Sequence, residues 1–318
     1  MADGGATDTG RVQTLEIFVR RMSETLVVIR STTIGERETN LANQLLNLNL
    51  FRVLAVLDAT GAKTAVCTNG VEPFDDALVM TDDWVQGEGL HHARAEQTRG
   101  TGWLCGDYVF YRILELNWDY AWVVEPDVFF LNGGQRIFTD TASFTHDVIA
   151  SNIGLADDWY WATPFNKLVP EMAPARIDFP LVRVSRKAAE KSLELRREIS
   201  RRLDGREVLI PNDESVVGST LFQNKLTFLD MADRWPELFQ YWSTNAKFNV
   251  DDLAQLESSP LIVHSGKRVE EYLECALSIW EKANNGWSGQ AEYLFESLRG
   301  LQMDSFNRLC KAIGEKLQ

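Results

Sequence analysis

Cysteine is scarce in this sequence, and its few copies lie far apart. The four cysteines, Cys67, Cys105, Cys275 and Cys310, form no Cys-x-x-Cys pair. Without such pairs the sequence does not indicate a zinc ribbon, and dispersed thiols do not make the dense disulfide framework of small secreted proteins. We therefore expect buried free thiols in a reducing cytosol.

Long apolar runs are also missing. No stretch approaches the ~18 consecutive apolar residues that a membrane-spanning helix needs. Residues 1–10 are small and acidic, without the basic and apolar blocks of a signal peptide. We expect a flexible tail over 1–12, no membrane span and a cytoplasmic location.

Basic residues are outnumbered. The chain of 318 residues has 32 Lys and Arg against 46 Asp and Glu, a formal net charge of −14. This balance disfavours non-specific nucleic-acid binding, which needs clustered positive charge. The basic residues of 183–206 alternate with glutamates, which is typical of a solvated, salt-bridged helix. The hydrophobic content of 45% is that of a globular protein and excludes a disordered chain.

Several catalytic motifs are absent as well. The sequence has no G-x-G-x-x-G after its first apolar run, no Walker lysine loop, no G-x-S-x-G and no H-E-x-x-H. These absences disfavour NAD-dependent enzymes, P-loop kinases, serine hydrolases with a nucleophile elbow, and zincins.

What the sequence does contain is an alternation of short β-branched runs and amphipathic segments. The runs predict strands over 25–29, 53–57, 77–80, 120–124, 179–184 and 260–264. The amphipathic segments predict helices over 36–51, 107–116, 186–204, 268–283 and 288–316, a helix start at 211–214, and a long loop over 87–106. This order predicts an α/β fold with a parallel sheet. We expect one domain over 13–270, with a helical C-terminal extension over 271–318 packed on it.

The most informative segment is Glu125-Pro126-Asp127, which follows the predicted strand 120–124. Ligands of open α/β sheets bind outside the carboxyl ends of the strands, and two carboxylates there suit a divalent cation that also binds substrate phosphates. The alternative is an exposed turn that closes the strand. Trp122 and Phe129 favour burial, and a buried acid pair needs a compensating cation.

Glu125-Pro126-Asp127 resembles the D-x-D motif of nucleotide-sugar-dependent glycosyltransferases of the GT-A fold, although its first acid is Glu. The resemblance covers roughly residues 24–270. It implies a GT-A-like, Rossmann-related, mostly parallel sheet flanked by helices. It also implies a Mn²⁺ or Mg²⁺ ion that bridges the diphosphate of the donor.

The resemblance further implies roles for side chains at several predicted strand and helix ends. The implied metal ligands are Asp127, His264 and Glu125. The implied donor-binding residues are Arg30, Ser31, Thr32, Asp83, Asp107, Glu125 and Lys267. For His264 a hydrogen-bonded core histidine remains the alternative, and for Asp107 a helix N-cap.

The segment Asn212-Asp213-Glu214 supplies the candidate catalytic acids. In inverting GT-A enzymes an acid in a comparable late segment removes the proton of the acceptor hydroxyl, and general-base help of this kind contributes about 10²–10⁴-fold. The alternative is a plain helix N-cap. The sequence leaves open which of Asp213 and Glu214 faces the substrate, and a retaining enzyme needs neither.

We therefore expect a metal-dependent hexosyl- or pentosyltransferase that moves a sugar from a nucleoside-diphosphate sugar, with a UDP-sugar as the expected donor, to an acceptor hydroxyl. The alternatives are a nucleotidyltransferase and a non-catalytic carbohydrate-binding relative of the fold. The sequence does not identify the acceptor, which is a glycan, a protein, a small molecule or a nucleic acid. The acidic net charge makes a nucleic acid the least favoured of these. Trp159, Tyr160, Trp161 and Trp242 offer aromatic faces for a sugar or a base, with core packing as the alternative.

Overall fold

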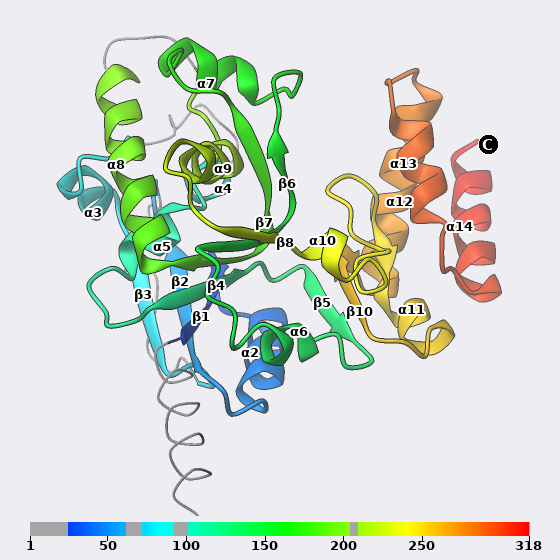
Figure 1. Ribbon diagram of the computed structural model, residues 1–318. Helices are drawn as coiled ribbons and strands as arrows, with labels where there is room; N and C mark the ends of the chain where they lie inside the picture. The colour runs from blue at the N-terminus through cyan, green and yellow to red at the C-terminus, as the bar shows by residue number, and fades with distance from the viewer. Residues whose placement is uncertain (1–24, 62–71, 92–100, 204–208, 318) are drawn as a thin grey trace, which may run out of the picture. The chain divides into compact units, whose positions relative to one another are not determined.

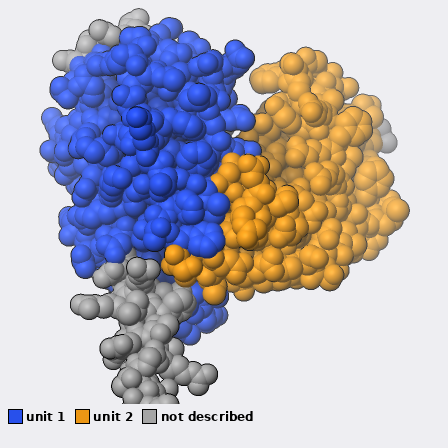
Figure 2. Space-filling view, viewed as in Figure 1, with its two compact units in different colours: residues 1–124, 144–229 blue, residues 125–143, 230–318 orange. Residues whose placement is uncertain are grey.

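The computed structural model of the protein describes residues 25–61, 72–91, 101–203 and 209–317 (Figure 1). The expected tail over 1–12 lies outside these residues. The chain clusters in two compact units, one of residues 1–124 and 144–229 and one of residues 125–143 and 230–318 (Figure 2). The division at residues 12 and 270 that we expect from the sequence stays a prediction.

Unit 1 is built on a seven-stranded sheet with the order β3-β2-β1-β4-β7-β6-β8. Strand β1 runs parallel to β2 and β4, and β2 runs parallel to β3, whereas β7 is antiparallel to β4 and β6. The predicted α/β fold with a mostly parallel sheet is thus confirmed. The strands are β1 (Thr25–Ser31), β2 (Arg52–Asp58), β3 (Asp76–Met80), β4 (Tyr120–Val124), β6 (Val148–Leu155), β7 (Ala175–Ser185) and β8 (Phe228–Asp230).

Helices flank this sheet because its strands are apolar on both faces. Leu26 and Val28 of β1 belong to the main core, in which side chains of α5, α8 and α9 also pack. Val27 and Ile29 alternate with them and are equally buried, and α2 packs against β1 and β2. The helices are α2 (Glu36–Leu46), α3 (Asp82–Gly87), α4 (Thr101–Leu104), α5 (Tyr108–Arg112), α7 (Ala162–Leu168), α8 (Arg186–Leu203) and α9 (Asp213–Gln223).

Unit 2 contains two short strand pairs and a set of helices. Strand β5 (Val128–Leu131) is antiparallel to β10 (Leu261–His264), and β9 (Phe248–Asn249) is parallel to β11 (Gly266–Lys267). The helices are α6 (Arg136–Asp140), α10 (Met231–Arg234), α11 (Val250–Leu256), α12 (Val269–Asn284), α13 (Gln290–Ser297) and α14 (Met303–Lys316). The predicted C-terminal helical region is confirmed. Within the described ranges we find no helix with the length and apolar content that crossing a bilayer requires.

Several predicted element bounds differ from the structure. The helix predicted over 36–51 already ends at Leu46, and the predicted loop over 87–106 contains α4. The helix predicted over 288–316 is two helices, α13 and α14. The chain between them passes through Gly300, whose φ of +71° and close contact with Leu253 suit glycine alone.

Candidate functional site

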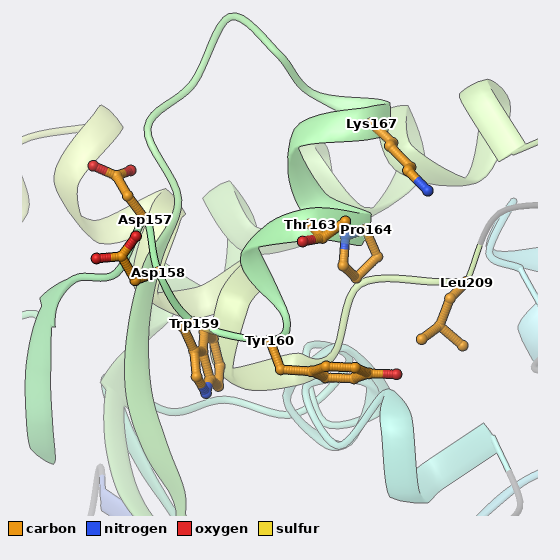
Figure 3. Close-up of a pocket in the computed structure, with 8 residues that line it drawn as sticks. All are labelled: Asp157, Asp158, Trp159, Tyr160, Thr163, Pro164, Lys167 and Leu209. Carbon is orange, nitrogen blue, oxygen red and sulfur yellow. The ribbon is translucent and has the colours of Figure 1, made fainter.

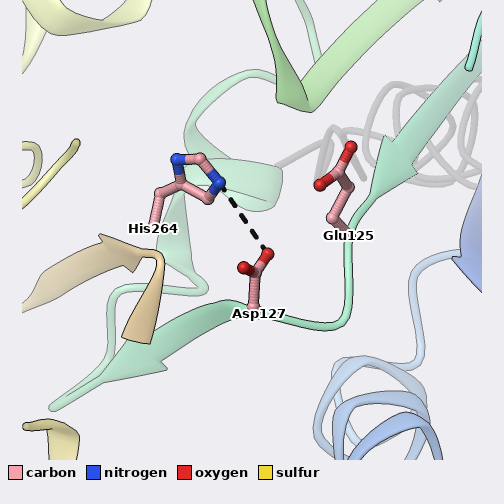
Figure 4. A group of neighbouring side chains, drawn as sticks. All are labelled: Glu125, Asp127 and His264. Carbon is pink, nitrogen blue, oxygen red and sulfur yellow. Dashed lines mark ion pairs between the residues drawn. The ribbon is translucent and has the colours of Figure 1, made fainter. Parts of the chain in front are cut away.

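Three of the predicted site residues, Glu125, Asp127 and His264, come together in unit 2 (Figure 4). Each offers one ligand atom, and the three atoms lie within 4.8 Å of one another. His264 Nε2 lies 3.8 Å from Asp127 Oδ1. The register of β5 and β10 explains this proximity, because His264 pairs with Val128, the residue directly after Asp127.

The imidazole of His264 is buried, and it is neutral, as a metal ligand must be. Its side chain is only 7% exposed, and its ring lies 5.0 Å from the ring of Trp242. Burial lowers the pKa of His264 to about 4, against the opposing effect of the Asp127 carboxylate. With this lowered pKa, His264 is neutral near pH 7. The neutral imidazole is the form that binds a metal ion.

The turn after His264 fixes the position of this side chain. Ser265 has a positive φ of 61°, which is uncommon for a residue other than glycine. The backbone N–H of Gly266 donates to the carbonyl oxygen of Asp127 at 3.3 Å. A Cβ at Gly266 would lie 2.5 Å from the ring of Phe129 and 2.6 Å from the side chain of Val250. The turn therefore requires a residue without a side chain at position 266.

Gly266→Ala is expected to lower the free energy of unfolding by about 1–3 kcal/mol, because the added methyl group overpacks the contact with Phe129. Urea unfolding of the full chain measures this loss. The matched control is Gly314→Ala in α14, where a Cβ meets no atom within 4 Å. That control should be neutral or stabilising, and an equal loss in both variants would contradict the packing account.

Two lysines add positive charge beside the cluster. Lys267 is one of the predicted donor-binding residues, and its Nζ lies 3.3 Å from Glu271 Oε1. Lys247 donates from Nζ to Ser265 Oγ at 3.0 Å. Both lysines lower the pKa of His264 through their charge. Sequence reasoning missed Lys247, because only the pairing of β9 with β11 brings it next to the turn.

In unit 1 the structure joins a predicted donor-binding residue to a predicted catalytic acid. Arg30 Nη1 lies 3.2 Å from Asp213 Oδ2, and the guanidinium carbon lies 5.4 Å from the ring centroid of Phe179. The same carboxylate oxygen accepts the backbone N–H of Gly106 at 3.1 Å. A Cβ at Gly106 would collide with both side chains, so glycine is needed for this contact.

The predicted helix start at residues 211–214 is confirmed, and the structure separates the roles of its polar residues. Asn212 is the N-cap of α9 and accepts the backbone N–H of Ser215 at 3.1 Å. Glu214 is half-buried and accepts the Asn212 amide at 2.9 Å. Asp213 Oδ1 also accepts the backbone N–H of Glu214 at 2.8 Å, so Asn212 and Asp213 both satisfy free N–H groups of the first turn.

Asp107 is placed differently from the expected donor-binding role. Its side chain is fully buried, and Arg196 donates to both carboxylate oxygens, at 2.8 and 2.7 Å. Tyr111 donates its hydroxyl to Asp107 at 2.6 Å, and burial, together with the charge of Asp107, raises the pKa of Tyr111. The pair with Arg196 leaves neither side chain exposed to solvent, and the donor-binding role of Asp107 stays a prediction.

The remaining predicted donor-binding residues follow β1 and β3 in unit 1. Ser31 donates its hydroxyl to Glu38 at 2.8 Å. Thr32 and Asp83 are exposed, and Asp83 lies in the first turn of α3. These strands are parallel, so the residues after their carboxyl ends share one edge of the sheet.

Neither the protein-family models nor the curated proteins compared with this chain include a match. The structure groups Glu125, Asp127, His264 and Lys267 in unit 2, and it pairs Arg30 with Asp213 in unit 1.

Proposed function

We propose that this protein is a metal-dependent glycosyltransferase of the GT-A type. It would transfer a sugar from a nucleoside-diphosphate sugar, with a UDP-sugar as the expected donor, to an acceptor hydroxyl. The observation that carries the proposal is the cluster of Glu125, Asp127 and His264, whose ligand atoms lie within 4.8 Å of one another. The acid pair follows the carboxyl end of β4, a strand with a parallel neighbour, and ligands of open α/β sheets bind outside such ends, which supports the proposal.

The residues of this cluster fit a Mn²⁺ or Mg²⁺ ion. Two carboxylates and one neutral imidazole supply oxygen and nitrogen donors, a set that suits Mn²⁺ in particular. Glu125 and Asp127 are half-buried, which leaves room for phosphate oxygens from the donor. A bound ion supplies positive charge where the departing diphosphate develops negative charge.

The chain's own residues would then bind the donor and manage the proton. Lys267 and Lys247 add fixed positive charge beside the cluster, which favours a diphosphate there. In unit 1 the Arg30 guanidinium pairs with the Asp213 carboxylate at 3.2 Å and holds it in place. Glu214 is half-buried whereas Asp213 is buried, so we assign removal of the acceptor proton to Glu214 if the reaction inverts.

A thermal-shift screen of nucleotide sugars, each with and without Mn²⁺, tests this function. We expect one donor to stabilise the full chain only when Mn²⁺ is also present. A ligand at a hundred times its Kd stabilises by about 2.7 kcal/mol, which is a clear shift in melting temperature.

The control pair for this screen is Asp127→Asn against Asp304→Asn, an exposed acid in the first turn of α14. Only Asp127→Asn should abolish the joint effect of donor and metal. If no donor shifts the melting temperature with or without metal, the proposal is wrong. Release of pyrophosphate from a nucleoside triphosphate would instead favour a nucleotidyltransferase.

A further inference from the structure

A pocket of about 440 Å³ lies in unit 1 around the start of α7 (Figure 3). It is formed by the segment that joins β6 to α7 and by the first turns of that helix. Pro164 and Leu209 contribute apolar surface to its wall. Its polar and aromatic lining comes from Asp157, Asp158, Trp159, Tyr160, Thr163 and Lys167.

Two aromatic side chains of the pocket, Tyr160 and Trp159, are exposed to solvent in part or in large part. The Tyr160 side chain is 70% exposed, far more than core packing would leave. Its ring makes an edge contact with Trp161 at 5.0 Å and 82°, and Figure 3 shows it extended below Pro164 toward Leu209. Trp159 lines the same pocket and is half-buried.

The backbone of this segment is also ordered by its own hydrogen bonds. The N–H of Trp159 donates to Ala156 at 3.3 Å, and the N–H of Ala162 donates to Trp159 at 2.9 Å. These bonds order the backbone that carries Trp159 and Tyr160 before α7 begins. An ordered backbone lowers the conformational entropy that the segment loses when it binds a ligand.

We propose that this pocket binds a neutral saccharide. The faces of Tyr160 and Trp159 suit the apolar C–H faces of sugar rings, and carboxylates accept hydrogen bonds from sugar hydroxyls. Two aspartates against one lysine disfavour a phosphate or a uronic acid by charge. The volume lies in the range of small-ligand pockets and holds a saccharide unit of one or two rings.

This inference is independent of the proposed transfer reaction, since binding is measured without donor or metal. The probes are maltohexaose, cellohexaose, xylohexaose and tetra-N-acetylchitotetraose, titrated into the full chain by calorimetry, with an oligogalacturonate as the charged comparison. We expect at least one neutral probe to bind with a Kd in the millimolar range or better, and more tightly than the oligogalacturonate.

Tyr160→Ala is expected to weaken binding of that probe by about tenfold or more. The exposed ring contributes little to the core, so this variant should fold, and its unfolding curve verifies that. The matched control is Phe295→Ala in α13 of unit 2, a ring that is 73% exposed and outside the pocket. The proposal is overturned if no neutral probe binds, if the oligogalacturonate binds best, or if Tyr160→Ala binds as the wild type does.

Discussion

Asp127→Ala is expected to lower the metal-dependent release of nucleoside diphosphate by about 10²-fold or more. His264 Nε2 lies 3.8 Å from Asp127 Oδ1, and the ligand atoms of Asp127, Glu125 and His264 all lie within 4.8 Å of one another. Loss of groups that merely orient metal ligands costs about 10–100-fold in affinity or activity. Loss of a ligand itself should cost at least as much. Steady-state release of the diphosphate, measured over a range of Mn²⁺ concentrations, gives the effect.

The control for this variant is Asp304→Ala, which removes an exposed acid of the same unit and should leave the rate unchanged. His264→Ala should resemble Asp127→Ala in its Mn²⁺ dependence, because both remove one donor of the same set. If Asp127→Ala keeps the wild-type rate and Mn²⁺ dependence, the cluster is not the metal site.

Arg196→Met is expected to lower the free energy of unfolding by about 3–5 kcal/mol, because it leaves a buried carboxylate without its partner. Arg196 and Asp107 are both fully buried and joined by two hydrogen bonds. Arg196 also donates to the carbonyl oxygen of Pro211 at 2.7 Å, directly before the N-cap of α9. The pair therefore ties α5 and α8 to the segment that leads to Asp213. Urea unfolding of the full chain measures the loss.

A double-mutant cycle separates the charge from the packing. Asp107→Leu combined with Arg196→Met removes both charges and should recover much of the stability that either single change loses. The surface control is Lys191→Met, which breaks an exposed pair with Glu194 and should cost less than 1 kcal/mol. If Arg196→Met costs no more than Lys191→Met, the buried pair does not have the role described here.

The sequence predicted the strands that are rich in β-branched residues and the helix start at α9. Thr25–Ser31 and Arg52–Asp58 form strands because they are buried on both faces of a parallel sheet, which gives a continuous apolar run. Strand β6 (Val148–Leu155) was missed because Ser, Asn and Gly interrupt its apolar run. Asn152 has a positive φ there, and the register with β7 shifts nearby.

In the candidate site, the sequence predicted the residues next to one strand better than the contacts between distant segments. Glu125 and Asp127 could be predicted as site residues from the sequence, because they directly follow an apolar strand. The proximity of His264 depends on the pairing of β5 with β10, which joins segments more than a hundred residues apart. No local pattern specifies such a pairing, so only the resemblance to GT-A enzymes suggested it.

The charged helix α8 is the clearest case of a partly wrong prediction. A solvated, salt-bridged helix was expected, and exposed pairs such as Lys191 with Glu194 confirm it. Arg196 departs from that description because it is fully buried against Asp107. Helical periodicity places Arg196 on the inner face, but it does not reveal which distant carboxylate meets it.

The most direct test of the account is the release of nucleoside diphosphate from a panel of nucleotide sugars by the purified full chain, with Mn²⁺ and with a chelator. The account predicts that one donor is turned over, that the chelator stops turnover, and that Asp127→Ala stops it while Asp304→Ala does not. If no donor releases a diphosphate in the presence of Mn²⁺, or if release continues unchanged in the chelator, the protein is not a metal-dependent glycosyltransferase.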